Sequence, residues 1–145
     1  MTENVATLKI LAMFMLESDF KREPNIKIDG SEKFESKLEI RAGEGGENNQ
    51  IFSELTVSAR IRYNDEVQAE AKVKIVGVFL TGNMSPEDKK NYAFVNCPAI
   101  IFPFVREHIT SLFVKAGMKA YMLDAVNFVD MYRQQKPIPT SEITT

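Results

Sequence analysis

Residues 34–76 contain three stretches in which apolar and polar side chains alternate one by one. The stretches cover residues 34–42, 54–63 and 67–75, and in each the charged residues share one set of alternate positions. A period of two is the repeat of a β-strand, whose successive side chains point to opposite faces. The sequence therefore predicts three strands that bury one face and expose the other to water.

The connections between these stretches predict how the strands pair. Residues 43–50 are rich in glycine, and Tyr63–Glu66 is a short turn containing Asn and Asp, which tolerate left-handed backbone conformations. Consecutive strands with short links favour an antiparallel meander that is solvated on one face.

An earlier stretch, from Ile10 to Leu16, is apolar on both alternating faces. A strand of this kind needs cover on both sides, whereas the other three need cover on only one. Two interpretations remain open: an inner strand beneath a loop, or a surface that contacts another subunit or a bound polypeptide.

Helix signals follow the strands. Ser85, with proline next and acidic residues after it, predicts a helix that runs to about Val95. Because proline is tolerated at the first position of a helix and disrupts its interior, Pro103 predicts the start of a longer helix over 103–116. Gly117 stands where a C-terminal cap is expected.

The last helix is predicted from Asn127, with Asp130 three residues on, to Gln135. Residues 136–145 are expected to be disordered. Strands followed by helices, in one domain spanning residues 1–145, give an α+β fold: a four-stranded antiparallel sheet with helices packed on one face.

Composition excludes several functional classes. The formal net charge is −2, which argues against nucleic-acid binding because that requires a basic face. One cysteine allows no intrachain disulfide and fits a reducing compartment. We see no signal peptide and no apolar run of about 20 residues, so we expect a cytoplasmic protein without an integral membrane segment.

No motif predicts catalysis, a metal site or a cofactor. The glycines of residues 43–46 lack the lysine that a phosphate-binding loop requires, and indicate a hairpin loop. His108 is the single histidine, and Cys97 has no basic neighbour in sequence to activate its thiol. The pair Arg106–Glu107 is typical of an ion pair on a helix surface. We therefore expect a protein that is not an enzyme.

Two blocks of sequence carry a resemblance to a known family. Cys97–Leu112 reads CPAIIFPFVREHITSL, and Leu123–Tyr132 reads LDAVNFVDMY. Both resemble signature segments of the SecB family of protein-export chaperones, with Ala125 in place of the usual proline. Gly77–Phe79 also looks like the end of the fourth strand in that family.

The resemblance implies a homotetramer built as a dimer of dimers. Two subunits would join through the first strand and the long helix, and two dimers would pack through their helices. For this interface we expect contributions from Ile10, Phe14, Phe104 and Ile109.

The resemblance also implies that unfolded polypeptides lie in long apolar grooves. A micromolar complex needs about 8 kcal/mol, whereas burying one large apolar side chain gives roughly 1.5–3 kcal/mol, so several side chains must act together. Methionine and aromatic residues suit this because they adapt to many sequences. The residues that we expect to contact such clients are Met13, Met15, Phe79, Met118, Tyr121, Met122, Phe128 and Met131.

A further implied partner is the SecA motor ATPase, which would meet an acidic face of the sheet. The candidate residues on that face are Glu17, Asp19 and Glu70. Lys72 and Lys74 interrupt its acidity.

The sequence thus favours an ATP-independent chaperone, or holdase, that binds unfolded precursor proteins for Sec-dependent export. The alternative is a SecB-like chaperone or binding module dedicated to one partner, such as an antitoxin. An enzyme is the least favoured class, because no cluster of titratable groups is visible.

Overall fold

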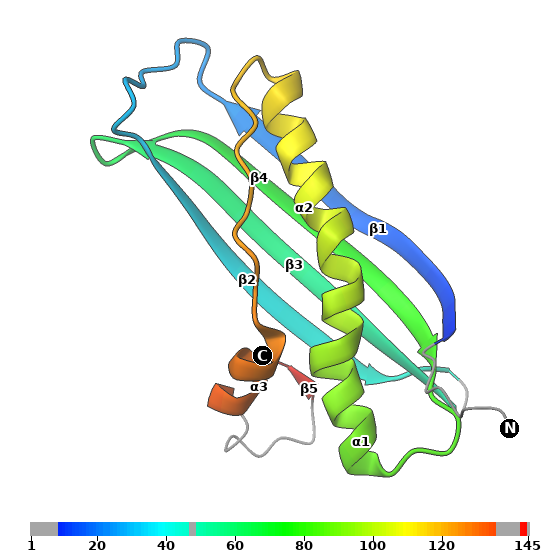
Figure 1. Ribbon diagram of the computed structural model, residues 1–145. Helices are drawn as coiled ribbons and strands as arrows, with labels where there is room; N and C mark the ends of the chain where they lie inside the picture. The colour runs from blue at the N-terminus through cyan, green and yellow to red at the C-terminus, as the bar shows by residue number, and fades with distance from the viewer. Residues whose placement is uncertain (1–8, 47–48, 136–142, 145) are drawn as a thin grey trace, which may run out of the picture.

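A long antiparallel sheet forms one layer of the molecule in the computed structural model, which describes residues 9–46, 49–135 and 143–144 (Figure 1). The strand order is β1-β4-β3-β2-β5, in which β5 is the short strand Ile143–Thr144. The four long strands are β1 (Lys9–Arg22), β2 (Lys33–Glu44), β3 (Gln50–Tyr63) and β4 (Glu66–Leu80). The four-stranded antiparallel sheet predicted from the sequence is confirmed.

The predicted meander comprises β2, β3 and β4. In β3, Leu55, Val57 and Ile61 are buried on one face, and the register of the sheet aligns them with β2 and β4 residues of the same face. The hairpin between β3 and β4 turns at Asn64 and Asp65, both with positive φ (50° and 65°). This left-handed pair is the conformation expected of a two-residue hairpin turn.

β1 is an edge strand, paired with β4 and not enclosed between two strands. The interpretation of β1 as an inner strand is therefore wrong. The apolar residues on both faces of β1 therefore need another explanation. The exposure of their side chains to solvent, described below, supplies it.

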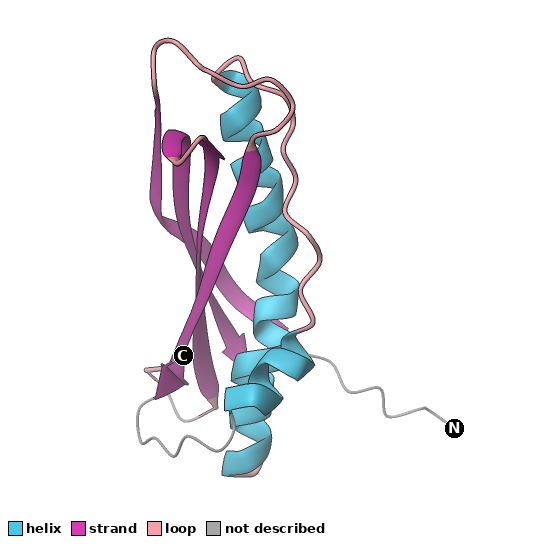
Figure 2. Cartoon of the chain, turned by 90° about the vertical axis from the view of Figure 1, so that its left-hand side faces the viewer, coloured by secondary structure: helices cyan, strands magenta, loops and turns pink. Residues whose placement is uncertain are grey.

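One face of the sheet is covered by a helical run and by an extended chain segment (Figure 2). The run consists of α1 (Pro86–Asn91), a π-helical turn η1 (Tyr92–Asn96) and α2 (Cys97–Lys115). Residues 118–127, here called the crossing segment, then lead to α3 (Phe128–Gln135). The predicted arrangement of helices on one face is confirmed.

The helix predicted to start at Pro103 in fact starts earlier, because Pro103 lies inside α2. An interior proline costs about 3 kcal/mol through its missing N–H and its clash with the preceding turn. Ile101 and Val105 on either side of it are buried against the sheet, and two such side chains offset that cost at roughly 1.5–3 kcal/mol each. Tertiary burial therefore overrides the local signal.

The caps predicted from the sequence form as expected. The Ser85 hydroxyl accepts a hydrogen bond from the Asp88 N–H (3.1 Å) at the start of α1. At the end of α2, Gly117 adopts a φ of 81°. The Met118 and Gly117 N–H groups then bond to the carbonyls of Phe113 and Val114, which is a Schellman motif. The Asn127 side chain accepts from the Asp130 N–H (3.0 Å) before α3.

Only part of the C-terminal tail belongs to the residues that the structure describes. Residues 136–142 and 145, for which we predicted disorder, are outside the described residues. Ile143–Thr144 form β5, which pairs with Arg41 and Ala42 of β2. The prediction of disorder is wrong for those two residues.

Within the described part of the chain, one helical run, Pro86–Lys115, is long and apolar enough to cross a membrane by length and composition. Its Ile101, Val105, Ile109 and Phe113 side chains are buried in the hydrophobic core of the chain. That burial is the pattern of a core helix packed on a sheet.

Candidate functional site

The edge strand β1 exposes a row of large apolar side chains. Its members are between 42% and 55% exposed, and they form what is here called the β1 apolar surface: Ile10, Leu11, Phe14, Met15 and Leu16. Edge strands of stable monomers are usually protected by charges or by cover. A contiguous apolar edge of this kind marks a contact surface.

Two irregularities in the pairing of β1 explain why both of its faces are apolar. The register with β4 shifts between Ile10 and Ala12 and again between Met15 and Glu17. These shifts leave Leu11 and Leu16 as the extra residues of two β-bulges, and a bulge resets the alternation of the strand. Apolar side chains therefore appear on the helix face, on the outer face and at the edge.

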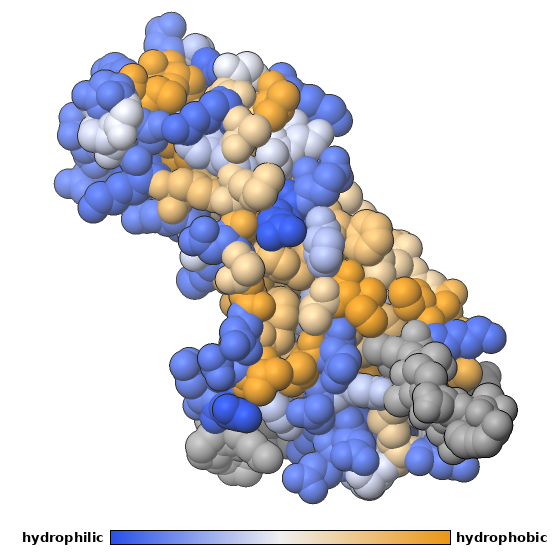
Figure 3. Space-filling view, viewed as in Figure 1, coloured by the Kyte–Doolittle hydropathy of each residue, from blue (hydrophilic) through white to orange (hydrophobic). Residues whose placement is uncertain are grey.

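The β1 apolar surface continues onto α2. The Ser18 hydroxyl of β1 lies 2.8 Å from Nε2 of His108, which fixes the side of α2 that faces β1. Phe104 precedes His108 by one helical turn and is exposed on the same side. Hydrophobic residues accordingly gather on the right-hand side of the molecule, where β1 lies beside α2 in Figure 1 (Figure 3).

A second apolar area lies between α2 and the crossing segment. It is an open groove of about 530 Å³ whose lining includes Pro103, Val114 and Met122. Met122 is 61% exposed, the largest fraction among the exposed large apolar residues described. Met122 is the residue of the crossing segment that lines the groove, and the other lining residues belong to α2. The polar ones among them are Arg106, Glu107, Thr110, Ser111 and Lys115.

The candidate client-binding residues divide into two groups. Met15 and Met122 are exposed, and Met13, Met118 and Met131 are partly buried against the core. These five have side-chain surface available for contact.

Phe79, Tyr121 and Phe128 are buried, so their side chains offer little surface for client contact in this structure. Phe79 folds over Gly77, where a Cβ atom would lie 2.5 Å from its ring. The Tyr121 ring lies 5.4 Å from that of Phe113. The sequence identified apolar residues in the right segments but not the direction of each side chain.

Of the four candidate interface residues, Ile10, Phe14 and Phe104 are exposed, whereas Ile109 is fully buried. Ile109 lies on the sheet-facing side of α2 and belongs to the hydrophobic core of the chain. It is therefore unavailable for contact with another copy. Leu11, Leu16, Val114 and Val129 are exposed apolar residues that the sequence reasoning did not single out.

The outer face of the sheet carries a network of ion pairs. Glu17 lies 3.8 Å from Nζ of Lys72 and 3.9 Å from Nζ of Lys74. Lys74 also approaches Glu54 (3.8 Å), which pairs with Arg41 at 3.3 Å. This chain of contacts crosses all four long strands, so the carboxylates of this row are compensated by cations.

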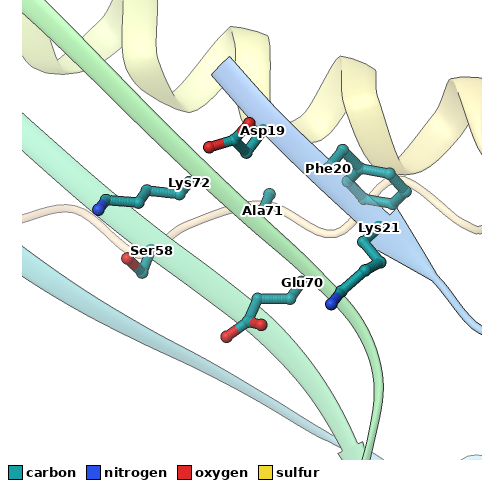
Figure 4. A pocket seen from close by; sticks show the side chains of 7 residues that line it. All are labelled: Asp19, Phe20, Lys21, Ser58, Glu70, Ala71 and Lys72. Atoms are coloured by element: carbon teal, nitrogen blue, oxygen red, sulfur yellow. The ribbon is translucent and has the colours of Figure 1, made fainter. Parts of the chain in front are cut away.

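The remaining two candidates for a motor-binding face border a shallow hollow of about 470 Å³ on the outer face, around Ser58 (Figure 4). Asp19 and Glu70 share this hollow with Lys21 and Lys72, and Glu70 pairs with Arg60 at 3.9 Å. The hollow is lined by both signs of charge and is not an acidic patch.

The described residues offer little reactive chemistry. They contain no cluster of three or more His, Cys, Asp or Glu side chains that could hold a metal ion. Burial raises the pKa of the Cys97 thiol to about 12, which removes the thiolate that a nucleophile requires. The exposed apolar side chains of β1 and of the groove beside α2 are suited to binding by contact.

The sequence profile of the family described as "Preprotein translocase subunit SecB" matches residues 3–137. The chain belongs to the SecB family. Two relatives named "Protein-export protein SecB" illustrate the similarity. The relative from Orientia tsutsugamushi (strain Boryong) is 34% identical over 105 residues, 72% of this chain and 66% of the relative. The relative from Pseudomonas putida (strain F1) is 33% identical over 113 residues, 78% and 65% of the two chains. This SecB-family chain therefore spans slightly less than two thirds of the length of these relatives.

A solved structure supports the fold of this SecB-family chain. It is a SecB-like chaperone of Mycobacterium tuberculosis in complex with a ChAD peptide from an antitoxin. The TM-score is 0.72 at 14% identity, and the match covers 83% of this chain and 91% of the other. The similarity shows that the two chains share the SecB-like arrangement of sheet and helices.

Proposed function

We propose that this SecB-family chain is an ATP-independent holdase that binds unfolded precursor proteins for Sec-dependent export. The observation that carries the proposal is the exposure of large apolar side chains along β1 and beside α2. Membership of the SecB family supports it, as do the names of the relatives. Such binding needs neither catalysis nor nucleotide, and its place of action would be the cytoplasm.

The amount of apolar surface favours an assembly of several copies. A micromolar complex requires about 8 kcal/mol, and ordering costs reduce what each contact contributes. One subunit has two separate apolar areas. We propose that the β1 apolar surface, together with Phe104, joins copies of the chain into a dimer, and that two dimers form a tetramer.

The groove between α2 and the crossing segment would then remain for clients. Met122 is the most exposed large apolar residue that lines it. The partly buried Met118 lies in the same segment, and Met131 lies in the helix that follows. Methionine is unbranched and adapts to many shapes, which suits clients of varied sequence. We therefore assign client contact to this groove.

The partner that receives the client is a separate question. SecA is the candidate for an export chaperone, and Glu17, Asp19 and Glu70 remain candidate contacts. Their interspersion with Lys21, Lys72 and Lys74 indicates a mixed-charge interface, which would be weakened by salt. The second candidate function is a chaperone dedicated to an antitoxin, favoured by the antitoxin peptide bound to the structural neighbour.

The test is suppression of aggregation of a chemically denatured model protein, without nucleotide. We expect suppression by the wild-type chain at near-stoichiometric ratio. Met122→Asp should weaken affinity for the unfolded protein about tenfold, because the apolar contact worth roughly 1.5–3 kcal/mol is replaced by a charge.

Ala125→Asp is the matched control, since Ala125 is exposed in the same crossing segment but does not line the groove. It should leave affinity unchanged. Equal effects of the two substitutions would refute the placement of the groove, and a wild-type chain that suppresses no aggregation would refute the holdase. Binding of one antitoxin alone, without affinity for unfolded proteins, would favour the second candidate.

A further inference from the structure

The crossing segment is held in place mainly by its side chains. No pairing with a strand is described for residues 119–126, whose one described backbone–backbone bond runs from the Tyr121 N–H to the Lys119 carbonyl. The Thr110 hydroxyl donates to the Tyr121 carbonyl at 2.7 Å. The position of the segment therefore depends on a few anchors.

Over residues 121–124 of the crossing segment, side chains alternate between the core and solvent. Tyr121 and Leu123 are buried, whereas Met122 between them is exposed over the groove. In an extended chain, successive side chains point to opposite sides. Holding Tyr121 inward therefore holds Met122 outward.

Glu32 anchors the side chain of Tyr121, whereas Thr110 anchors its backbone. The Glu32 side chain is only 6% exposed, and its Oε2 accepts a hydrogen bond from the Tyr121 hydroxyl at 3.0 Å. Its Oε1 accepts from the Gly30 N–H at 2.8 Å, and Nζ of Lys119 lies 3.6 Å from Oε2. Burying an unpaired charge is costly, and these three partners compensate the nearly buried carboxylate of Glu32.

Glu32 is the last residue of the loop that joins β1 to β2, residues 23–32. Arg22 holds the other end of this loop. Arg22 donates from Nη1 to the Ala116 carbonyl at 2.6 Å and from Nη2 to the Pro24 carbonyl at 2.9 Å. The C-terminal end of α2, which precedes the crossing segment, is thus held independently of Glu32. What Glu32 adds is the orientation of Tyr121 and, through it, of Met122.

We propose that Glu32 is a positioning residue for client contact, which it controls by holding the Tyr121 hydroxyl and so keeping Met122 over the groove. Neither the family membership nor the sequence patterns assign this role to it. The binding consequence rests on the proposed function, whereas the positioning does not.

The positioning is tested without a client. A chain carrying Met122→Cys is labelled with an environment-sensitive fluorophore, and Cys97 stays unlabelled because it is buried and its pKa is raised to about 12. Adding Glu32→Ala should shift the emission of the label toward that of a water-exposed dye. Glu32→Gln, which retains an oxygen acceptor for the Tyr121 hydroxyl, should restore the wild-type emission.

Two further variants keep the test decisive. Tyr121→Phe removes the same hydrogen bond and retains the ring, so it should reproduce the Glu32→Ala shift even where that variant folds poorly. Glu39→Ala, which removes an exposed glutamate of β2 outside the groove, should change nothing.

On unlabelled chains, Glu32→Ala should weaken affinity for an unfolded model protein about fivefold, and Glu32→Gln should rescue it. An unchanged emission in both Glu32→Ala and Tyr121→Phe overturns the inference. A shifted emission supports the positioning even if the wild-type chain binds no unfolded protein, a result that would overturn the proposed function alone.

Discussion

Cys97 illustrates how burial decides the chemistry of a single residue. Its side chain is buried at the start of α2 in the hydrophobic core. Desolvation raises the pKa of the thiol from its ordinary value of 9.0 to about 12. Because this folded pKa lies above the unfolded one, the residue favours folding below pH 9, and this contribution is lost as pH rises toward 12.

The Cys97 thiol should therefore be inert in the folded chain. We expect no reaction with a disulfide reagent at pH 8 under native conditions and complete reaction in denaturant, measured by the absorbance of the released chromophore. Rapid stoichiometric reaction of the native chain would show that the thiol is accessible or ionised.

At the scale of elements, close contacts decide which apolar residues become core. Gly77 of β4 leaves room for the Phe79 ring, and a Cβ atom there would also lie 3.3 Å from Ile101 of α2. β4 and α2 therefore pack closely at Gly77, where there is no room for a larger residue. This packing buries Phe79, which the sequence had suggested as a client contact.

Gly77→Ala should consequently destabilise the chain by about 1–3 kcal/mol, because overpacking displaces the ring. Urea unfolding followed by circular dichroism measures this. Gly46→Ala, at a glycine with no atom within 4 Å of the added Cβ, is the control and should change stability little. If both substitutions proved neutral, the close packing over Gly77 would be wrong.

Local signals in the sequence predicted the elements well and the side-chain directions less well. Alternation determined β2, β3 and β4, because a half-buried strand repeats every two residues. The start of α2 was missed because burial of Ile101 and Val105 outweighs the local effect of Pro103. The bulges at Leu11 and Leu16 have no signature in composition, so the two-sided apolar strand could be recognised but its edge position could not. Glu32 was missed because its partner Tyr121 is 89 residues away.

At the scale of the whole molecule, one subunit leaves more apolar surface uncovered than a stable monomer needs. The β1 apolar surface and Phe104 lie on one side, and the groove beside Met122 lies on another. We assign the first area to other copies of the chain and the second to unfolded clients. Both assignments follow from the cost of leaving large apolar side chains in water.

Size-exclusion chromatography with light scattering tests both assignments, on the chain alone and mixed with a permanently unfolded protein. We expect a mass of several copies of the 16.4 kDa chain, and a heavier complex in the mixture. Phe14→Asp should lower the mass of the chain alone, since it places a charge in the β1 apolar surface. A mass of 16.4 kDa that does not change in the mixture would contradict both the assembly of several copies and the binding of unfolded protein.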